Sequence, residues 1–199
     1  MLFRSRIVAA ARLAGIKTGV RSRTFDGSRI GRGASMGRLL SSRDRFAGMR
    51  ARRAVVKASL IRLQGKGGQA ARAHMRYIQR DGVTREDEPG KLYGPDIDRV
   101  NGSDFLERGT HDRHQFRFIV SAEDGADYPD LKPYVRRLMT QVEQDLGTKL
   151  DWVAVDHFNT ERPHTHIVLR GVDERGDNLI IAREYLAHGL RERASELVT

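Results

Sequence analysis

The chain has 199 residues, 39% of them hydrophobic and 31% charged, so it is long enough for one ordinary domain with a real core. No run of about eighteen apolar residues occurs, which argues against a transmembrane helix. The apolar patch between Met1 and Lys17 is interrupted by Arg12 and precedes no clear cleavage site, so we do not interpret it as a secretion signal. Cysteine is absent, which excludes disulfides and thiol ligands and leaves His, Asp or Glu to hold any metal ion.

The net charge of +10 comes from the N-terminal part of the chain. Residues 1–53 contain 14 Lys and Arg against 2 Asp and Glu, whereas residues 54–199 contain 22 against 24. A basic arm favours a polyanionic partner, although a solvated tail or an unused upstream start codon would explain it equally well. Because residues 1–53 are rich in Arg, Ser and Gly and lack a sustained period, we predict a mostly disordered arm with fluctuating helix near Ile7 to Leu13.

The first half of the folded region, which we expect to begin at Ala54, is predicted to contain two strands and one helix. Alternating apolar and polar residues indicate the strands, and the helix ends near a C-terminal glycine. A polar loop rich in Gly and Pro follows the helix, and loops of this length tend to be functional or mobile. In chain order, we predict a strand at 55–63, a helix at 69–79, the loop at 82–113 and a strand at 114–121.

The second half is predicted to contain an amphipathic helix, a strand pair and a final helix. The two strands are joined by six residues, which favours an antiparallel pair. The predicted elements are a helix at 131–146, strands at 151–157 and 164–171, a short strand at 179–181 and a helix at 182–198. This order predicts an α+β fold over residues 54–199, in which an antiparallel β-sheet carries helices packed on one face.

Three of the seven histidines fall within ten residues and form the strongest chemical signal in the chain. His164 and His166 lie two residues apart on a predicted strand, so their imidazoles point to the same face. The short connection can bring His157, at the end of the preceding strand, beside them. Three neutral imidazoles on rigid strands suit a divalent metal ion with open positions for substrate, such as zinc, manganese, nickel or cobalt. Magnesium also fits if phosphate oxygens and water molecules complete its coordination shell.

The stretch DHFNTERPHTHIV, residues 156–168, resembles the third motif of mobilisation relaxases. These are strand-specific endonucleases of conjugative and mobilisable elements. They include the T-DNA border-nicking enzymes and belong to the P-type mobilisation family of His-hydrophobe-His endonucleases. The motif reads His-x-Asp, a few residues, then Pro-His-x-His before an apolar strand. The chain differs at Asn159, where Asp is usual, and at Thr165, where the wider class has an apolar residue. The resemblance implies a catalytic role for Asn159. It implies one also for Glu161, whose carboxylate could substitute for that of the usual Asp.

The first motif of the same family is a helical tyrosine in a context like Arg-Tyr-Ile, and Tyr77 matches it within HMRYIQRDG, residues 74–82. The helical pattern adds an independent observation. Ala71, Met75 and Ile78 form an apolar stripe, and Tyr77 lies roughly 100° or more away from each of them. Tyr77 is therefore not required in the core, and the resemblance implies that it is the nucleophile. Tyr93, in a loop rich in Gly and Pro, is the alternative.

The second family motif is a strand that carries a DNA-contacting serine, for which Ser121 is the candidate. By strand parity, Ser121 and Arg117 share the face opposite Phe116 and Phe118. We therefore assign Ser121, Arg117 and Arg80 to DNA binding. The resemblance covers about residues 54–199, and because related enzymes are typically longer, we expect the nuclease domain to be truncated at its C-terminal end.

The activity that the resemblance implies is metal-dependent nicking of DNA at a transfer origin. The tyrosine would attack a phosphodiester of single-stranded DNA and form a 5′-phosphotyrosine, with magnesium or manganese as the divalent cofactor. Implied partners are the accessory proteins of a relaxosome and the coupling protein of a type IV secretion system. No membrane contact is expected, and the implied location is the bacterial cytoplasm.

Two rival interpretations remain open at the level of sequence. A rolling-circle replication initiator or transposase also combines His-x-His with a tyrosine, but usually places the tyrosine after the histidines, which would select Tyr185. Alternatively, the chain is a catalytically impaired fragment that only binds DNA, as Asn159 would suggest. Detection of a covalent adduct between protein and DNA separates the enzyme from the binding fragment.

Overall fold

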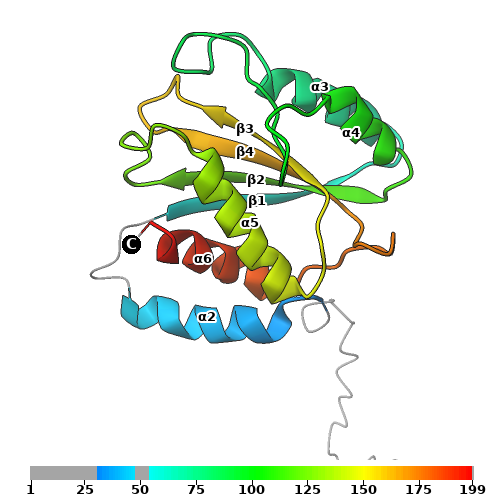
Figure 1. Ribbon diagram of the computed structural model, residues 1–199. Coiled ribbons are helices and arrows are strands. Elements are labelled where there is room, and N and C mark those ends of the chain that lie inside the picture. Colours follow the sequence, from blue (N-terminus) through cyan, green and yellow to red (C-terminus); the bar gives the residue numbers. More distant parts are fainter. Residues whose placement is uncertain (1–30, 48–53, 199) are drawn as a thin grey trace, which may run out of the picture.

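A computed structural model describes residues 31–47 and 54–198, which form a four-stranded antiparallel sheet with helices on both sides (Figure 1). The strands are β1 (Ala54–Arg62), β2 (His114–Ala122), β3 (Trp152–His157) and β4 (His164–Arg170). Their order across the sheet is β1-β2-β4-β3. The expected α+β class with an antiparallel sheet is confirmed.

The larger core lies between one face of the sheet and helix α5 (Lys132–Leu146). Alternation builds this face, since Phe116 and Phe118 on β2 and Ile167 on β4 are all buried on it. Helix α5 contributes an apolar stripe that includes Val135 and Leu138. The helix ends at Gly147, which adopts the left-handed conformation. The backbone N–H of Gly147 donates hydrogen bonds to carbonyl oxygens of the last turn.

Part of the predicted arm is ordered. Residues Ala34–Ala47 form helix α2, and Leu40 of this helix is fully buried in the larger core. Gly37 permits the contact, since a Cβ there would lie 2.6 Å from the backbone nitrogen of Tyr185. The prediction of disorder is therefore wrong for residues 31–47. The expected fluctuating helix near Ile7 to Leu13 lies outside the described residues.

Helices α3 (Gly67–Ile78) and α4 (Gly102–Arg108) pack on the opposite face of the sheet, over β3 and β4. Met75 and Ile78 of α3 contact a second core cluster that contains Val155 and Val168. The sequence predicts helices on one face of the sheet only, whereas α3 and α4 cover the second face as well. Helix α4 falls inside the segment predicted as a long loop.

The C-terminal region differs in detail from the sequence prediction. Residues Tyr185–Gly189 form a π-helix, and α6 (Leu190–Glu196) continues it, in place of one α-helix over 182–198. The predicted strand at 179–181 is reduced to an isolated parallel bridge between Ile181 and Arg32. Within the described part of the chain, no helix is long and apolar enough to cross a membrane.

Candidate metal centre

His157, His164 and His166 come together at the adjoining ends of β3 and β4. The register pairs His157 directly with His164, and strand parity places His166 on the same face. One potential ligand atom from each histidine lies within 4.8 Å of the others. The ring centroids are 4.5 Å apart for His157 and His166, and 5.1 Å apart for His164 and His166. The three residues are therefore close enough to bind one metal ion.

The tautomer of His157 is fixed by the helix that carries Tyr77. His157 Nε2 lies 2.8 Å from the carbonyl oxygen of Ile78 in the last turn of α3. A carbonyl only accepts hydrogen bonds, so Nε2 carries the proton and Nδ1, which lies 3.5 Å from Nη1 of Arg80, has the lone pair that could bind a metal ion. Carbonyls at a helix C-terminus lack intrahelical partners, which makes Ile78 available for this contact. A backbone carbonyl thus orients the imidazole, as carbonyls and carboxylates commonly do behind metal ligands.

His164 is oriented by its own loop. Its Nδ1 donates to the carbonyl oxygen of Arg162 at 3.1 Å, which leaves Nε2 to face the cluster. Its ring is half-buried, whereas His157 and His166 are buried. Of the three rings, that of His164 is therefore the most accessible to solvent.

Burial and the proximity of other histidines favour the neutral form of His157 and His166. Burial, followed by the proximity of His157 and His164, lowers the pKa of His166 to about 3. Burial also lowers the pKa of His157, an effect partly offset by its bond to Ile78. Neutral imidazole is the form that binds metal ions, and three such donors fit a divalent ion with open coordination positions.

We expect the stability of the metal-free protein to fall as the pH is lowered. The unfolded chain takes up a proton at His166 below about pH 6.5, whereas the folded chain resists until its pKa of about 3. The stabilising contribution is therefore complete above about pH 6.5 and is lost as the pH falls towards 3. In urea unfolding with a chelator present, the free energy of unfolding of the wild type should fall with decreasing pH. The fall should be steeper than in His166→Gln by about 1 kcal/mol per pH unit. The exposed His111→Gln should keep the wild-type slope, and identical slopes for all three proteins would contradict the expectation.

Tyr77 lies beside the cluster with an accessible side chain. Its ring is 53% exposed and stands edge-on to His166, with 6.3 Å between the centroids. The guanidinium of Arg80 lies over the Tyr77 ring at 4.4 Å, and its Nη1 is 3.5 Å from Nδ1 of His157. Arg80 thus lies between the phenol and the histidines, where an anion bound at the site would meet its charge.

His74 is a site residue for which the sequence had suggested no role. It precedes Tyr77 by three residues on α3, stacks with its ring at 6.3 Å and stands edge-on to His166 at 6.0 Å. Burial, and then the charge of Arg117, lower the pKa of His74 to about 4. The spacing of three residues on a helix, which places side chains on one face, was the signal that could have identified it.

Asn159 and Glu161, which were expected to supply an amide or a carboxylate to the site, do not contact the three histidines. Asn159 and Glu161 are exposed in the loop between β3 and β4, and no hydrogen bond or ion pair connects them to the cluster among the described residues. Asp156 points to the other face, where it accepts from Tyr93 Oη at 2.8 Å and Thr165 Oγ1 at 2.6 Å. Burial raises the pKa of Asp156 to about 6.

The alternative tyrosines are both buried and bonded to carboxylates. Tyr93 is fully buried and donates to Asp156, while Tyr185 is 1% exposed and donates to Asp145 at 2.7 Å. Neither hydroxyl faces the histidine cluster in this arrangement. Of the three candidate nucleophiles, Tyr77 alone stands beside the three histidines.

Ser121 and Arg117 have protein partners on the same face of the sheet as the histidines. Ser121 Oγ donates to the carbonyl oxygen of Pro163 at 2.9 Å, immediately before His164. Arg117 donates to the carbonyl oxygen of Ala70 at 3.3 Å and is half-buried. Both hold neighbouring segments in place, and their proposed contacts with DNA remain predictions.

We expect Ser121→Ala to weaken metal binding more than it weakens the fold. Loss of the bond to Pro163 frees the segment that aims His164, and loss of such supporting bonds typically costs about 10-fold or more in metal affinity. Removing one such hydrogen bond should change the free energy of unfolding by only about 1 kcal/mol. Calorimetric titration with Mn²⁺ and urea unfolding measure the two effects. The exposed Ser59→Ala on β1 is the matched control, and equal Mn²⁺ affinity in both variants would contradict the role of Ser121.

No family model matches the chain, and comparison with curated proteins gave no match.

Proposed function

We propose that the protein is a metal-dependent DNA-nicking transesterase of the relaxase kind, with Tyr77 as its nucleophile. The observation that carries the proposal is the position of an exposed tyrosine edge-on to one of three clustered histidines. The resemblance of residues 156–168 and 74–82 to relaxase motifs supports the same activity. The tyrosine precedes the histidines in the chain, which favours a relaxase over a rolling-circle initiator or transposase.

In the proposed reaction, the phenolic oxygen of Tyr77 attacks the phosphorus of a phosphodiester in single-stranded DNA. A bond forms between this oxygen and phosphorus, while the bond from phosphorus to the 3′-oxygen breaks. The products are a 5′-phosphotyrosine and a strand with a free 3′-hydroxyl, which takes up a proton. The reverse attack by a 3′-hydroxyl rejoins the strand, because the phosphotyrosine retains the ester bond.

Arg80 is the residue best placed to assist this step. Its guanidinium lies over the Tyr77 ring, and its N–H groups can donate to a non-bridging phosphate oxygen. Arg80 would therefore contact both reacting groups.

His157, His164 and His166 would hold the metal ion through Nδ1 of the first and a free ring nitrogen of each of the others. A divalent ion at this place supplies charge that stabilises the transition state at the phosphate, and magnesium or manganese is the proposed identity. In the same proposal, single-stranded DNA at a transfer origin is the substrate. Accessory relaxosome proteins and a secretion coupling protein are the partners, and the bacterial cytoplasm is the location.

A covalent-adduct assay tests the proposal. The protein is incubated with labelled single-stranded oligonucleotides that tile the DNA around its own gene, in Mg²⁺, Mn²⁺ or a chelator. We expect an adduct that survives denaturation and forms only with the metal ion. Digestion and mass spectrometry should place a phosphate-linked nucleotide on the peptide containing Tyr77. An adduct that forms equally in the chelator would refute the metal, and one on another residue would refute the nucleophile.

A DNA-binding protein without nicking activity is the second candidate function. It is favoured by one observation, the absence of a carboxylate from the histidine cluster among the described residues. Such a protein would bind single-stranded DNA with strong salt dependence and yield no adduct with any oligonucleotide. The nicking enzyme would show the same salt dependence, so the adduct is the discriminating observation.

A further inference from the structure

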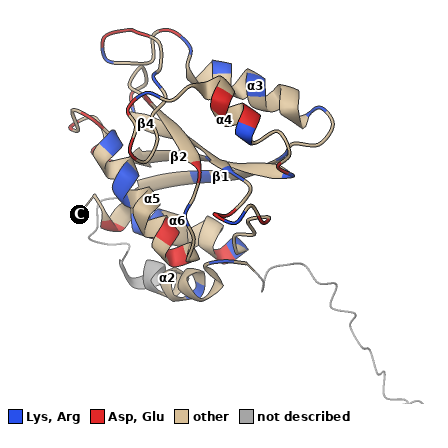
Figure 2. Ribbon diagram, turned by 45° about the vertical axis from the view of Figure 1, so that its right-hand side comes forward, with Lys and Arg blue, Asp and Glu red and all other residues tan. Residues whose placement is uncertain are grey.

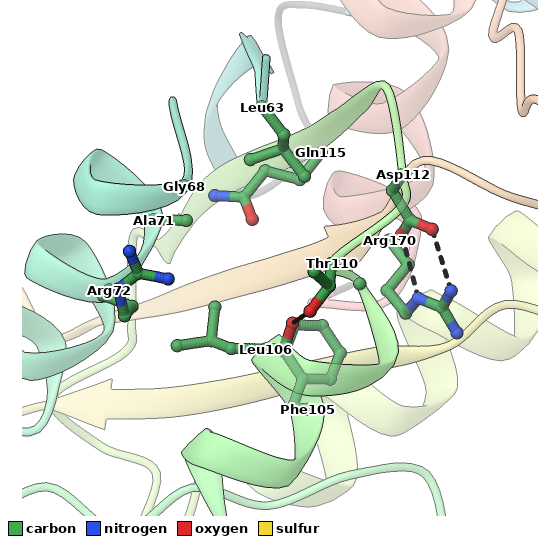
Figure 3. A pocket seen from close by; sticks show the side chains of 11 residues that line it. Leu63, Gly68, Ala71, Arg72, Phe105, Leu106, Thr110, Asp112, Gln115 and Arg170 are labelled. Carbon is green, nitrogen blue, oxygen red and sulfur yellow. Dashed lines mark hydrogen bonds and ion pairs between the residues drawn. The ribbon is translucent and has the colours of Figure 1, made fainter. Parts of the chain in front are cut away.

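A second pocket lies on the α3–α4 side of the sheet, away from the histidine cluster. The side chains of Arg72 on α3, Leu106 on α4 and Gln115 on β2 converge on it (Figure 3). Arg72 and Leu106 also line a groove that continues between α3 and α4 past Arg76. The pocket therefore opens into a channel along the helix that carries Tyr77.

The walls of the pocket combine apolar surface with few polar groups. Phe105 and Ala71 are buried behind it, and Leu106 is half-buried at its side. On the far wall, Arg170 forms a two-pronged ion pair with Asp112 at 2.8 and 2.9 Å (Figure 3), so these two charges neutralise each other. Apolar walls with a small number of placed polar groups are typical of sites for planar organic ligands.

Gln115 supplies a fixed polar contact. Its side chain is buried, and in the orientation that satisfies its hydrogen bonds the amide oxygen accepts from Nε and Nη2 of Arg117 at 2.8 and 2.9 Å. In this orientation the amide NH2 group also faces an acceptor of the protein, and it carries a second N–H. It can donate to an acceptor such as a ring nitrogen or carbonyl oxygen of a nucleobase.

The charge at the mouth of the pocket favours a phosphate. Arg72 and Arg76 are exposed, lie one turn apart and make no ion pair with any residue in 31–47 or 54–198. Basic residues lie on α3, which has no acidic residue, and acidic residues lie on α4 (Figure 2). The positive side of the groove is thus its α3 wall, and α3 is also the helix that carries Tyr77 on another of its faces.

We propose that this pocket binds one nucleobase of the DNA strand that the protein nicks, with a flanking phosphate on Arg72 and Arg76. The inference rests on the proposed nicking function, which it extends by naming a residue set that reads a base. The base packs against Leu106 and accepts from the amide of Gln115. Selection between bases arises because only some present an acceptor at that position.

Nuclear magnetic resonance titration of the full chain in a chelator tests the pocket without requiring nicking. The probes are the four 2′-deoxynucleoside 5′-monophosphates and inorganic phosphate. We expect at least one nucleotide to shift the Leu106 methyl and Gln115 amide signals, with affinity at least about 5-fold above that of phosphate. A ten-nucleotide strand of the preferred base should bind at least about 10-fold more tightly than the monomer, because more phosphates are engaged.

Two variants and a control make the outcome decisive. Leu106→Trp fills the pocket and should weaken nucleotide binding about 10-fold or more while phosphate binding persists. Arg72→Gln, at an exposed position, should weaken nucleotide and phosphate alike, and the exposed Ile97→Trp should change neither. Unmoved Leu106 and Gln115 signals at saturation, or tight monomer binding without tighter strand binding, would overturn the proposal. Because chelator abolishes the proposed nicking, failure here and failure of the adduct assay are separate results.

Discussion

Replacing Tyr77 with Phe should abolish the covalent adduct with DNA, a fall of at least about a thousand-fold, because no other oxygen nucleophile takes its place. The substitution removes one exposed hydroxyl, since the ring is 53% accessible. The free energy of unfolding should therefore change by less than about 0.5 kcal/mol. Single-stranded DNA binding should persist, as measured by fluorescence anisotropy at fixed salt.

Tyr185→Phe is the matched comparison. A rolling-circle arrangement would make Tyr185 the nucleophile, but this residue is buried and bonded to Asp145. We expect the Tyr185→Phe protein to form the adduct at the wild-type level per folded molecule, with a modest loss of stability. Retained adduct in Tyr77→Phe together with its loss in Tyr185→Phe would reverse the assignment.

Replacing His166 with Ala should remove high-affinity metal binding. His166 lies closest to His157 and is the central ring of the cluster, so two remaining imidazoles would hold a divalent ion at least about 100-fold more weakly. Calorimetric titration with Mn²⁺ measures the loss directly. The wild-type protein should gain about 2.7 kcal/mol of stability at a metal concentration 100 times the Kd, and the variant should gain little.

Two further variants protect this test against a folding artefact. His164→Ala alters a half-buried ring and should show the same loss of Mn²⁺ binding with a smaller effect on the fold. His111→Ala, at an exposed position outside the cluster, should bind Mn²⁺ as the wild type does. Undiminished Mn²⁺ affinity in both cluster variants would show that the ion binds elsewhere.

The contact between Ile78 and His157 couples the two halves of the site. The residue after Tyr77 provides the carbonyl that fixes the tautomer of His157, across 79 positions of sequence. Any shift of the last turn of α3 therefore moves the phenol and reorients His157 together. The same contact orients the imidazole of His157 through a backbone carbonyl.

The sequence by itself determined those features that depend on local periodicity. Strand parity placed His164 and His166 on one face, and a connection of six residues brought His157 opposite them. The helical period put Met75 and Ile78 in the core and left Tyr77 outside it. These results hold because the repeat of the backbone dictates which side chains share a face, whatever the rest of the chain does.

Tertiary structure decided which of these faces meet. The approach of Tyr77 and His74 to His166 depends on α3 packing over β3 and β4, on the face where no helix was expected. The order in residues 31–47 likewise depends on the buried contact of Leu40 with the distant C-terminal region. Such contacts join segments far apart in sequence through shape and burial, and no local period encodes them. The sequence could therefore bring the three histidines together as a cluster able to bind a metal ion, whereas their alignment with Tyr77 required the fold.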